Sequence, residues 1–435
     1  MSNLSDLLPA GAGGKQVKFV ASGTLANGQT VALKTDGQVE VVSASAASAG
    51  SIVVFNAETF SPSLAYDPTN NKVVLAYCDS GNNNYGTAVV GTVSGTSISF
   101  GTEVVFNTGN LDAISTTYDS TNNKIVIGYT DKGNSNYGTA IVGTVSGTSI
   151  SFGSEVVFNS ALSFYISVAY DSTNNKAVFA YYDGGGSSGA AGTAIVGTVS
   201  GTSISFSVGT NSVFKDPISG VKISAVFDSA NNKIVIAYTG AASSYLGNAI
   251  VGTVSGSNIS FGSETALSER AERVQAVYDS VNNKVIMFYV AGGDGDKGKA
   301  VIGTVSGTSI SFGSAITFST TGINQLSAAY GAVSGTGSVI AFYRGGSAYG
   351  TVISGATSAS NIVFGSALTI TTDATNYTTC VYDVNANKYV LAYQNQDTSE
   401  RGESVVFTDA STNNTSFIGI TDAAIANSAT GSVTV

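Results

Sequence analysis

An acidic residue recurs in this sequence at a nearly fixed spacing and is the first candidate for chemistry. It follows an aromatic residue in the phrase AYDSTNNK, which begins at Ala169, and near-copies of the phrase recur along the chain. Carboxylates in a regular array could bind cations or transfer protons. The alternative is structural, because Asp opens turns by accepting backbone N–H groups and Asn tolerates left-handed backbone. The repeated aspartates are Asp67, Asp119, Asp171, Asp228, Asp279 and Asp383.

The sixth copy of the phrase favours the structural interpretation. Its sequence is YGAVSGTGS, so Gly331 stands where the other copies have Asp, and no carboxylate remains in the phrase. Gly and Ser are turn-forming residues, so the shape of the turn can survive this change while acid chemistry cannot. We therefore predict that the repeated aspartates hold hairpin turns.

Other groups capable of chemistry are few. The chain has no His, which removes Ser–His and Cys–His pairs and imidazole metal ligands. Asp294 and Asp296 alternate in GGDGDKG, but the later ligands of an EF-hand loop are missing, so we expect a solvated loop. Cys78 and Cys380 lie in strand-like runs and are expected as buried thiols, and the sequence leaves a disulfide between them open. We predict no catalytic residue, no metal and no cofactor.

The elements that carry these residues are expected to be strands. Val, Ile, Thr, Tyr and Phe dominate the ordered runs, and the composition is 43% hydrophobic with 52 Gly and only 4 Pro. In the third repeat the alternation predicts four strands, at 166–171, 176–182, 193–200 and 203–206. A period of about 50 residues made only of strands is typical of a β-propeller with one four-stranded antiparallel blade per repeat. The fold class is therefore all-β, a seven-bladed propeller with a repeat of about 52 residues.

An antiparallel blade separates the repeated segments from the variable ones. The turns between its first and second strands, and between its third and fourth, lie on one face and are nearly identical in most repeats. The remaining loops lie on the opposite face and vary, as binding loops on a rigid scaffold do. Aromatic planes and Arg forks engage sugars and peptides. The candidate ligand-binding residues on this variable-loop face are Tyr85, Tyr137, Phe164, Tyr165, Tyr245, Arg270, Arg273, Arg344, Tyr349, Tyr377 and Arg401.

The two ends of the chain lack the repeat. Segments 1–50 and 416–435 are predicted to form one small β module, split by the propeller at 51–415, because the ends of a closed ring emerge close together. The segment Ser51–Phe55, SIVVF, matches EVVF at Glu103–Phe106. It is therefore a candidate to complete the last blade and remove an exposed sheet edge.

Charge and hydropathy exclude two classes of partner. The net charge is -10 with 18 Lys and Arg and no basic run, so nucleic acid is not an expected partner. No apolar run reaches the length of a membrane span, and the N-terminus lacks the apolar region of a signal peptide, so we expect no membrane insertion.

The flanks MSNLSDLLPAGAGGKQVKFVASGTLANGQTVALKTDGQVEVV and FIGITDAAIANSATGSVTV resemble virion structural proteins of tailed phages, notably marine cyanophages, and the small β modules of head-decoration proteins. The resemblance is confined to the flanks and carries over no functional residue. It implies a non-enzymatic virion protein of tail-fibre or appendage type, assembled in the host cytoplasm and anchored by its terminal module. The implied partners are capsid or tail proteins, a host-surface glycan or protein, and further copies of the chain, for instance as a trimer.

Two alternatives to this function remain open at the level of sequence. One is a head-decoration or purely architectural virion protein that binds no receptor. The other is a propeller-type glycan hydrolase, which would work with carboxylates and Tyr.

Overall fold

The computed structural model describes residues 16–25, 30–33, 37–41, 46–185, 190–207, 209–240, 245–333, 336–410, 417–421, 424–426 and 428–434. Contacts divide the chain into two compact units, Met1–Ala46 with Ala410–Val435, and Ala47–Asp409. The sequence placed the boundaries a few residues later, after 50 and after 415. Within the described ranges, no helix is both long and apolar enough to cross a membrane.

The first blade of the larger unit shows the plan of the others. Strands β6 (Thr59–Asp67), β7 (Lys72–Asp79) and β8 (Tyr85–Ser94) pair antiparallel in that order. The outer strand is in two pieces, because β9 (Ser97–Phe100) pairs with the second half of β8 and β10 (Val104–Asn107) with the first half. The sequence predicted only the first piece as strand and the second as loop. Both pieces find partners because β8 is long enough to pair with each in turn.

The next blades repeat this arrangement in chain order, and in three places the second outer piece runs on into the inner strand of the following blade. The strands of blades two to four are β11 (Leu111–Asp119), β12 (Lys124–Asp131), β13 (Tyr137–Ser146), β14 (Ser149–Phe152), β15 (Val156–Asp171), β16 (Lys176–Asp183), β17 (Ala191–Ser200), β18 (Ser203–Phe206), β19 (Ser212–Lys215), β20 (Ile218–Asp228), β21 (Lys233–Gly240), β22 (Leu246–Ser255), β23 (Asn258–Phe261) and β24 (Thr265–Arg270). Those of blades five to seven are β25 (Glu272–Asp279), β26 (Lys284–Ala291), β27 (Lys297–Ser306), β28 (Ser309–Phe312), β29 (Ile316–Val333), β30 (Thr336–Gly345), β31 (Tyr349–Thr357), β32 (Ile362–Phe364), β33 (Leu368–Asp383), β34 (Lys388–Asn395) and β35 (Arg401–Thr408).

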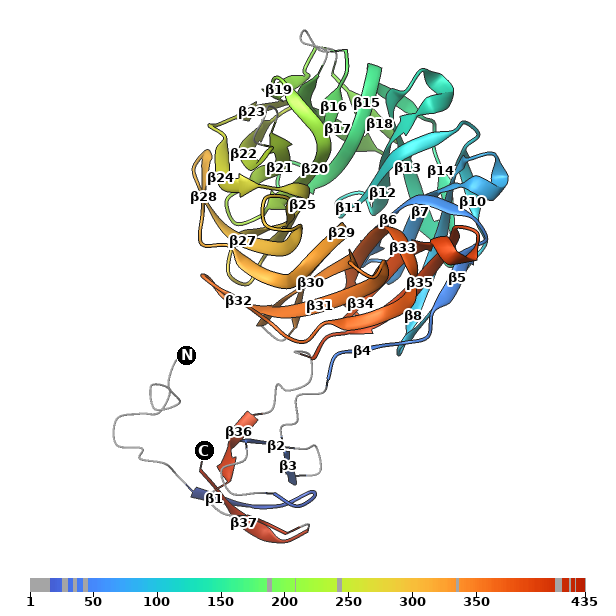
Figure 1. Cartoon of the computed structure of the whole chain (residues 1–435). Helices are drawn as coiled ribbons and strands as arrows, with labels where there is room; N and C mark the ends of the chain where they lie inside the picture. Colours follow the sequence, from blue (N-terminus) through green and yellow to red (C-terminus); the bar gives the residue numbers. More distant parts are fainter. Residues whose placement is uncertain are drawn as a thin grey trace. The chain divides into compact units, whose positions relative to one another are not determined.

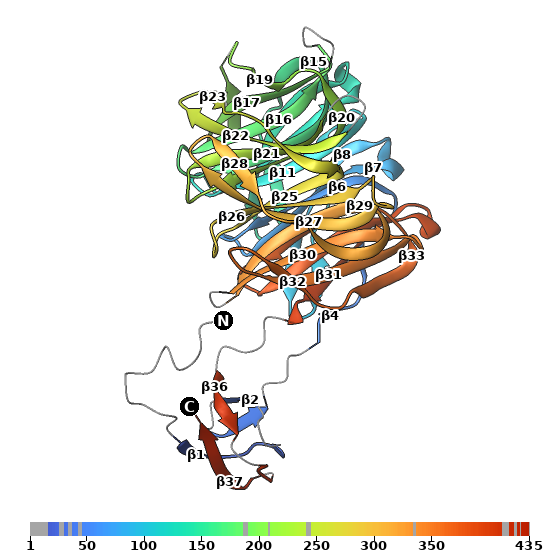
Figure 2. The same cartoon turned by 60° about the vertical axis from the view of Figure 1, so that its left-hand side comes forward.

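The N-terminal side of the unit closes the ring. Strands β4 (Ser48–Ala49) and β5 (Val53–Asn56) pair with β35 and supply the outer strand of the last blade. Figure 1 shows the blue β5 beside the red β35, with the blades arranged around a common axis. Figure 2 shows the same blades after a turn of 60°. The expectation that segment 51–55 completes the last blade is confirmed, and the all-β propeller class with it.

The hairpin turns between the first two strands are held as the sequence predicted. The Asp119 carboxylate accepts the backbone N–H groups of Thr121 and Asn122 at 3.0 and 2.9 Å. It also accepts a 2.9 Å bond from the side-chain amide of Asn122. The next residue, Asn123, has a left-handed φ of 53°, a conformation that Asn tolerates. The repeated Asp is therefore a structural residue of the turn.

The core lies between blades, where the second strands pack on both faces. Their sequences, such as KIVIGYTD in β12, are buried almost throughout, which explains the unbroken apolar runs. Cys78, in β7, is buried, and Cys380, in β33, is partly exposed; both are free. The disulfide that the sequence left open is not formed in the structure.

The smaller unit is a sheet built from both ends of the chain. Its strands are ordered β1 (Gln16–Val20), β37 (Thr430–Thr434), β36 (Phe417–Thr421), β2 (Thr30–Leu33) and β3 (Val39–Val41). A small apolar core holds it together, made of Ala21, Leu25, Val31, Val39, Ile425 and Val433. The split module expected from the sequence is thus present as a unit of its own.

Candidate binding site at the propeller axis

A β-bulge interrupts the innermost strand of each blade near the variable-loop face. In β15 the register shifts between Phe164, opposite Tyr182, and Ser167, opposite Ala180. Two residues of β15, Tyr165 and Ile166, therefore face one residue of β16. Tyr165 adopts a left-handed φ of 52°, which redirects its side chain from the regular alternation of the strand.

Among the described residues, six of the seven blades have a left-handed residue at the bulge. Such backbone is uncommon for residues other than Gly and costs energy that the surrounding sheet must supply. The residues and their φ angles are Ser61 (50°), Ala113 (48°), Tyr165 (52°), Arg273 (49°), Gln325 (53°) and Tyr377 (47°). Blade four differs, because its register shift extends from Ile218 to Ile223.

These bulges surround a cavity of about 560 Å³ on the axis, which we call the axial pocket. Lys222 of blade four lines it together with all six left-handed residues, and Asp112 and Phe164 lie beside them. A second cavity of about 230 Å³ shares Lys222 with the axial pocket and is lined further along the inner strands by Ser63, Ser115, Ser167, Ser224 and Ser327. All seven blades therefore contribute residues to the wall of the axial pocket, and the type of side chain differs between most of them.

Two cations of the axial pocket have no ion pair with any described residue. Among the carboxylates close to them, Asp112 is paired with Lys132 at 3.0 Å. Glu272 accepts bonds of 2.8 and 2.5 Å from Arg270. Among the residues that line the axial pocket, the cations without a described carboxylate partner are Lys222 and Arg273.

The protonation of these cations is opposed by their surroundings. Burial lowers the pKa of the Lys222 ammonium, and the positive charge of Arg273 lowers it further. Burial also lowers the pKa of Arg273, an effect that Glu272 partly offsets and Arg344 reinforces. The two groups therefore repel each other inside the pocket, where screening is weaker than in water.

Aromatic side chains form two walls of the axial pocket. Tyr165 is 40% exposed and packs edge-on against Tyr182, with ring centroids 6.4 Å apart. Tyr377 packs edge-on against Phe60 at 4.5 Å. Burial raises the pKa of both Tyr165 and Tyr377, so their hydroxyls stay protonated and can donate hydrogen bonds.

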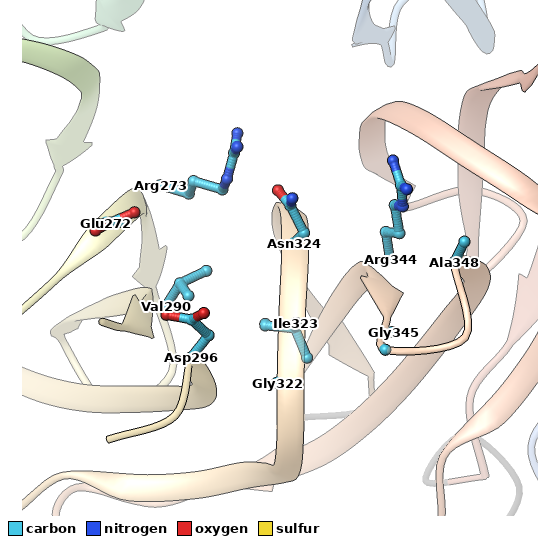
Figure 3. A pocket seen from close by; sticks show the side chains of 11 residues that line it. Glu272, Arg273, Val290, Asp296, Gly322, Ile323, Asn324, Arg344, Gly345 and Ala348 are labelled. Carbon is cyan, nitrogen blue, oxygen red and sulfur yellow. The ribbon is translucent and has the colours of Figure 1, made fainter. Parts of the chain in front are cut away.

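A neighbouring cavity of about 320 Å³ opens between blades five and six (Figure 3). Arg273 lines this cavity as well as the axial pocket, and Asn324 lies between Arg273 and Arg344 in the view. Arg344 donates a 3.3 Å hydrogen bond to Gln396. Arg273 is therefore shared between two polar cavities on the variable-loop face.

The structure brings some of the eleven candidate residues together and separates others. Phe164, Tyr165, Arg273 and Tyr377 line the axial pocket, and Arg344 lines the neighbouring cavity. Arg270 lies 5.0 Å from the centroid of the Tyr245 ring, outside both. The remaining four occupy the first position of the third strand in their blades and line neither cavity; they are Tyr85, Tyr137, Tyr349 and Arg401.

Sequence reasoning missed several residues of the axial pocket. Ser61, Ala113 and Gln325 stand 52 residues, or a multiple of 52, from the other bulge residues in their run of repeats, so the spacing alone could have found them. Lys222 follows the longer third repeat and falls out of that spacing. Asp112 precedes a bulge residue and looked like part of a variable loop.

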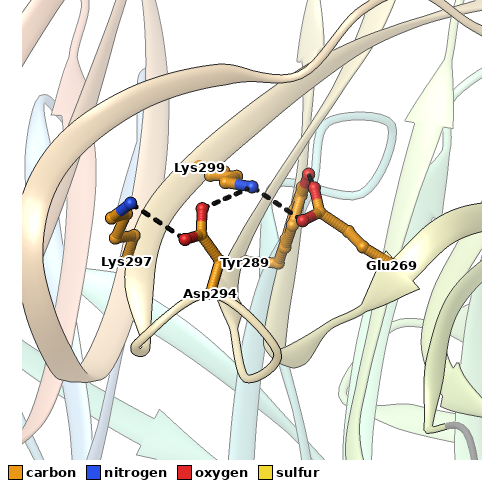
Figure 4. A network of polar contacts seen from close by, with 5 residues as sticks. All are labelled: Glu269, Tyr289, Asp294, Lys297 and Lys299. Atoms are coloured by element: carbon orange, nitrogen blue, oxygen red, sulfur yellow. Dashed lines mark hydrogen bonds and ion pairs between the residues drawn. The ribbon is translucent and has the colours of Figure 1, made fainter.

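The acidic loop GGDGDKG forms ion pairs with two lysines of its own blade (Figure 4). The Asp294 carboxylate accepts Lys297 at 2.9 Å and Lys299 at 3.1 Å. Lys299 also pairs with Glu269 at 2.7 Å, and Tyr289 donates to Glu269 at 2.6 Å. Both lysines lower the pKa of Asp294. The loop is solvated, as the sequence suggested, since Gly293, Gly295 and Asp296 are exposed, and an ion-pair network ties it to its blade.

Comparisons with known proteins support the fold. No family model matches the sequence, and neither does any curated protein. A fungal alcohol oxidase of the AA5 family, solved in complex with copper, matches with a TM-score of 0.54 and 10% identity over 83% of this chain and 76% of that one. A protein of unknown function from Dyadobacter fermentans has a TM-score of 0.49 and 10% identity over 84% of this chain and 100% of that one. A leech intramolecular trans-sialidase has a TM-score of 0.48 and 12% identity over 83% of this chain and 70% of that one. Of these three matches, the one with the alcohol oxidase supports the fold, and at 10% identity it is informative about the fold alone.

Proposed function

We propose that this protein is a non-enzymatic binding protein that takes a sugar residue of a host-surface glycan in its axial pocket. The observation that carries the proposal is the repeated bulge, which directs a different side chain to the same pocket from one blade after another. Blades that are otherwise near-copies differ here, as expected of a scaffold that displays a binding surface. The pocket volume of about 560 Å³ lies in the range of small-ligand sites.

The chemistry of the lining suits a saccharide. Tyr165 and Tyr377 offer flat aromatic faces for a sugar ring, together with hydroxyl donors. Ser61 and Gln325 add neutral hydrogen-bonding groups on other sides of the pocket. A pocket of this kind recognises its ligand by several modest contacts, and repeated copies on one particle would raise the apparent affinity.

The same proposal assigns the chain to the outside of a virion, as a tail-fibre or appendage protein held by its terminal β module. The support is the resemblance of the two flanks to phage virion proteins, together with their folding as a unit distinct from the propeller. Its partners in this role are other virion proteins, the host surface, and further copies of the chain. A purely architectural protein would share the anchor and bind no glycan.

The glycan-hydrolase alternative depends on the acid in the axial pocket. Hydrolysis with two carboxylates needs a general acid and a partner acid a few ångströms away. Asp112 is the carboxylate among the pocket residues that the structure describes, and it is paired with Lys132. This arrangement supports binding over turnover.

Binding of the purified full chain to host cells and to immobilised glycans tests the proposal. Tyr165→Ala and Tyr377→Ala are expected to weaken binding, whereas Tyr85→Ala, a loss of Tyr outside the pocket, is expected to leave it unchanged. Release of sugar fragments from a bound glycan would favour the hydrolase. No binding to cells or glycans by the unaltered protein would favour the architectural role.

A further inference from the structure

The axial pocket holds more positive charge than its own side chains neutralise. Lys222 and Arg273 line it with no ion pair to a described residue, and Asp112 contributes the opposing charge. The formal charges of these three groups sum to +1. A folded protein gains nothing by gathering two desolvated cations at one place, because burial without a counter-ion is costly. The pocket is therefore built at a cost in stability, as ligand sites commonly are.

We infer that the axial pocket takes a carboxylated sugar residue, with the carboxylate held by Arg273 and Lys222 and the ring lying against Tyr165 and Tyr377. This inference rests on the proposed function and names the class of sugar. A single carboxylate supplies the one negative charge that the lining lacks. The guanidinium of Arg273 presents parallel N–H donors that match the two carboxylate oxygens, and Lys222 adds a point charge.

The surroundings of the two cations favour binding over an internal ion pair. Glu272, the acid that precedes Arg273 in the chain, accepts hydrogen bonds of 2.8 and 2.5 Å from the guanidinium of Arg270. Asp112 forms an ion pair with Lys132 at 3.0 Å. Asp112 and Glu272 are thus engaged by cations that do not line the pocket, so these two acids compete little with an incoming carboxylate at Arg273 and Lys222.

The field of Asp112 also bears on the kind of anion. Asp112 raises the pKa of both Tyr165 and Tyr377, so its negative charge is felt at both aromatic walls. A carboxylate balances the net charge of +1 on Lys222, Arg273 and Asp112, whereas a phosphate monoester dianion would leave the filled pocket with a net charge of -1. The neutral hydroxyls of the sugar would meet Tyr, Ser and Gln side chains, which can donate and accept.

The test is isothermal titration of the full chain with methyl glycosides of glucuronate, galacturonate and N-acetylneuraminate, each beside its methyl ester. At least one acid is expected to bind, with its ester about tenfold weaker or more because the charge is removed. Arg273→Gln and Lys222→Met are each expected to weaken the acid about tenfold, as loss of a charged hydrogen bond does. Arg401→Gln, the same loss of charge on the variable-loop face but outside the pocket, is the matched control and is expected to change nothing.

Three outcomes would overturn the inference, and they bear differently on the proposed function. If a neutral sugar or a methyl ester binds with the same affinity as the acid, the pocket binds glycans but does not recognise a carboxylate. If inorganic phosphate displaces the acid with equal affinity, the site recognises anions and not sugars. If no saccharide of the panel binds while the unaltered protein still binds host cells, carboxylate recognition fails and host binding remains. Thermal unfolding of each variant shows that lost binding is not lost folding.

Discussion

The side-chain amide of Asn56 donates a 3.0 Å hydrogen bond to Glu103, and this bond joins the last blade of the ring to the first. Asn56 ends β5, which completes the last blade, whereas Glu103 lies between the two outer pieces of the first blade. The same Glu103 oxygen accepts a 2.7 Å bond from the buried hydroxyl of Tyr77. One carboxylate therefore connects the closing strand to the core of the blade beside it.

Glu103→Ala is expected to lower the free energy of unfolding by about 1–3 kcal/mol, because the hydroxyl of Tyr77 is then buried without an acceptor. Urea denaturation of the full chain measures the change. Glu58→Ala removes an exposed acid from the same part of the chain and is expected to cost much less. Equal midpoints for the two variants would mean that the carboxylate of Glu103 does not stabilise the closure.

The glycine that ends the phrase SISFG is expected to matter in some blades and not in others. A Cβ on Gly153 would overlap the backbone carbonyl oxygen of Thr202 in the next blade, and backbone cannot move aside as a side chain can. A Cβ on Gly313 would meet only the carbonyl oxygen of Ile302, at an ordinary 3.7 Å. Gly153→Ala should therefore destabilise by about 1–3 kcal/mol, as overpacking does.

Gly313→Ala is the matched control, since the two glycines occupy the same position of the same phrase. It is expected to be neutral or slightly stabilising, because Ala has less freedom to lose on folding. Thermal unfolding of the two variants compares them directly. A loss of stability in both would point to a backbone requirement common to the phrase instead of the contact with Thr202.

Much of the fold followed from the sequence because its blades are stabilised by local, repeated contacts. The turn built on Asp119 uses residues two and three positions along, so the phrase itself contains the whole arrangement. Closure by β5 could be predicted for the same reason, since Ser51–Phe55 repeats a phrase found elsewhere in the chain. The second outer piece was missed because its pairing with the first half of the third strand depends on where the chain turns back.

The axial pocket was only partly predictable, because a bulge leaves no mark in the apolar pattern. Tyr165, Arg273 and Tyr377 were chosen as aromatic or Arg residues on the variable-loop face, whereas Gln325 at the same structural position was not. Whether a candidate points to the axis or to the rim is decided by the left-handed φ of the bulge. Tyr85 has an equally suitable side chain but begins a third strand, away from the axis.

The two thiols are expected to be unreactive in the folded protein. Burial raises the pKa of Cys78 to about 11 and that of Cys380 to about 12, so almost no thiolate is present at pH 8. Ellman's reagent should label them slowly in buffer and label two thiols per chain at once in guanidinium without reductant. Absence of labelling in guanidinium would show a disulfide, and rapid labelling in buffer would show that the thiols are accessible.

Lys222 is expected to lower the free energy of unfolding, because its charge is placed in the axial pocket for ligand binding and not for stability. Its pKa is lowered by burial and by Arg273, so the folded state binds the proton less tightly than the unfolded chain does. Lys222→Met keeps most of the side-chain volume and removes the charge, so it should stabilise the protein at pH 7 by about 1 kcal/mol. If Lys222 had a purely structural role, Lys222→Met would instead lower the free energy of unfolding.

The pH dependence separates this effect from a simple gain in packing. Below the lowered pKa, Lys222 is charged in both states, and the folded state carries the full cost. As the pH rises from the lowered pKa toward the ordinary value near 10.5, the folded state loses its proton first, and the stability contributed by this group increases. The advantage of Lys222→Met over the unaltered protein should therefore shrink across that interval in denaturation at stepwise higher pH. An advantage that is constant with pH would assign the gain to packing by Met and not to the removal of a desolvated charge.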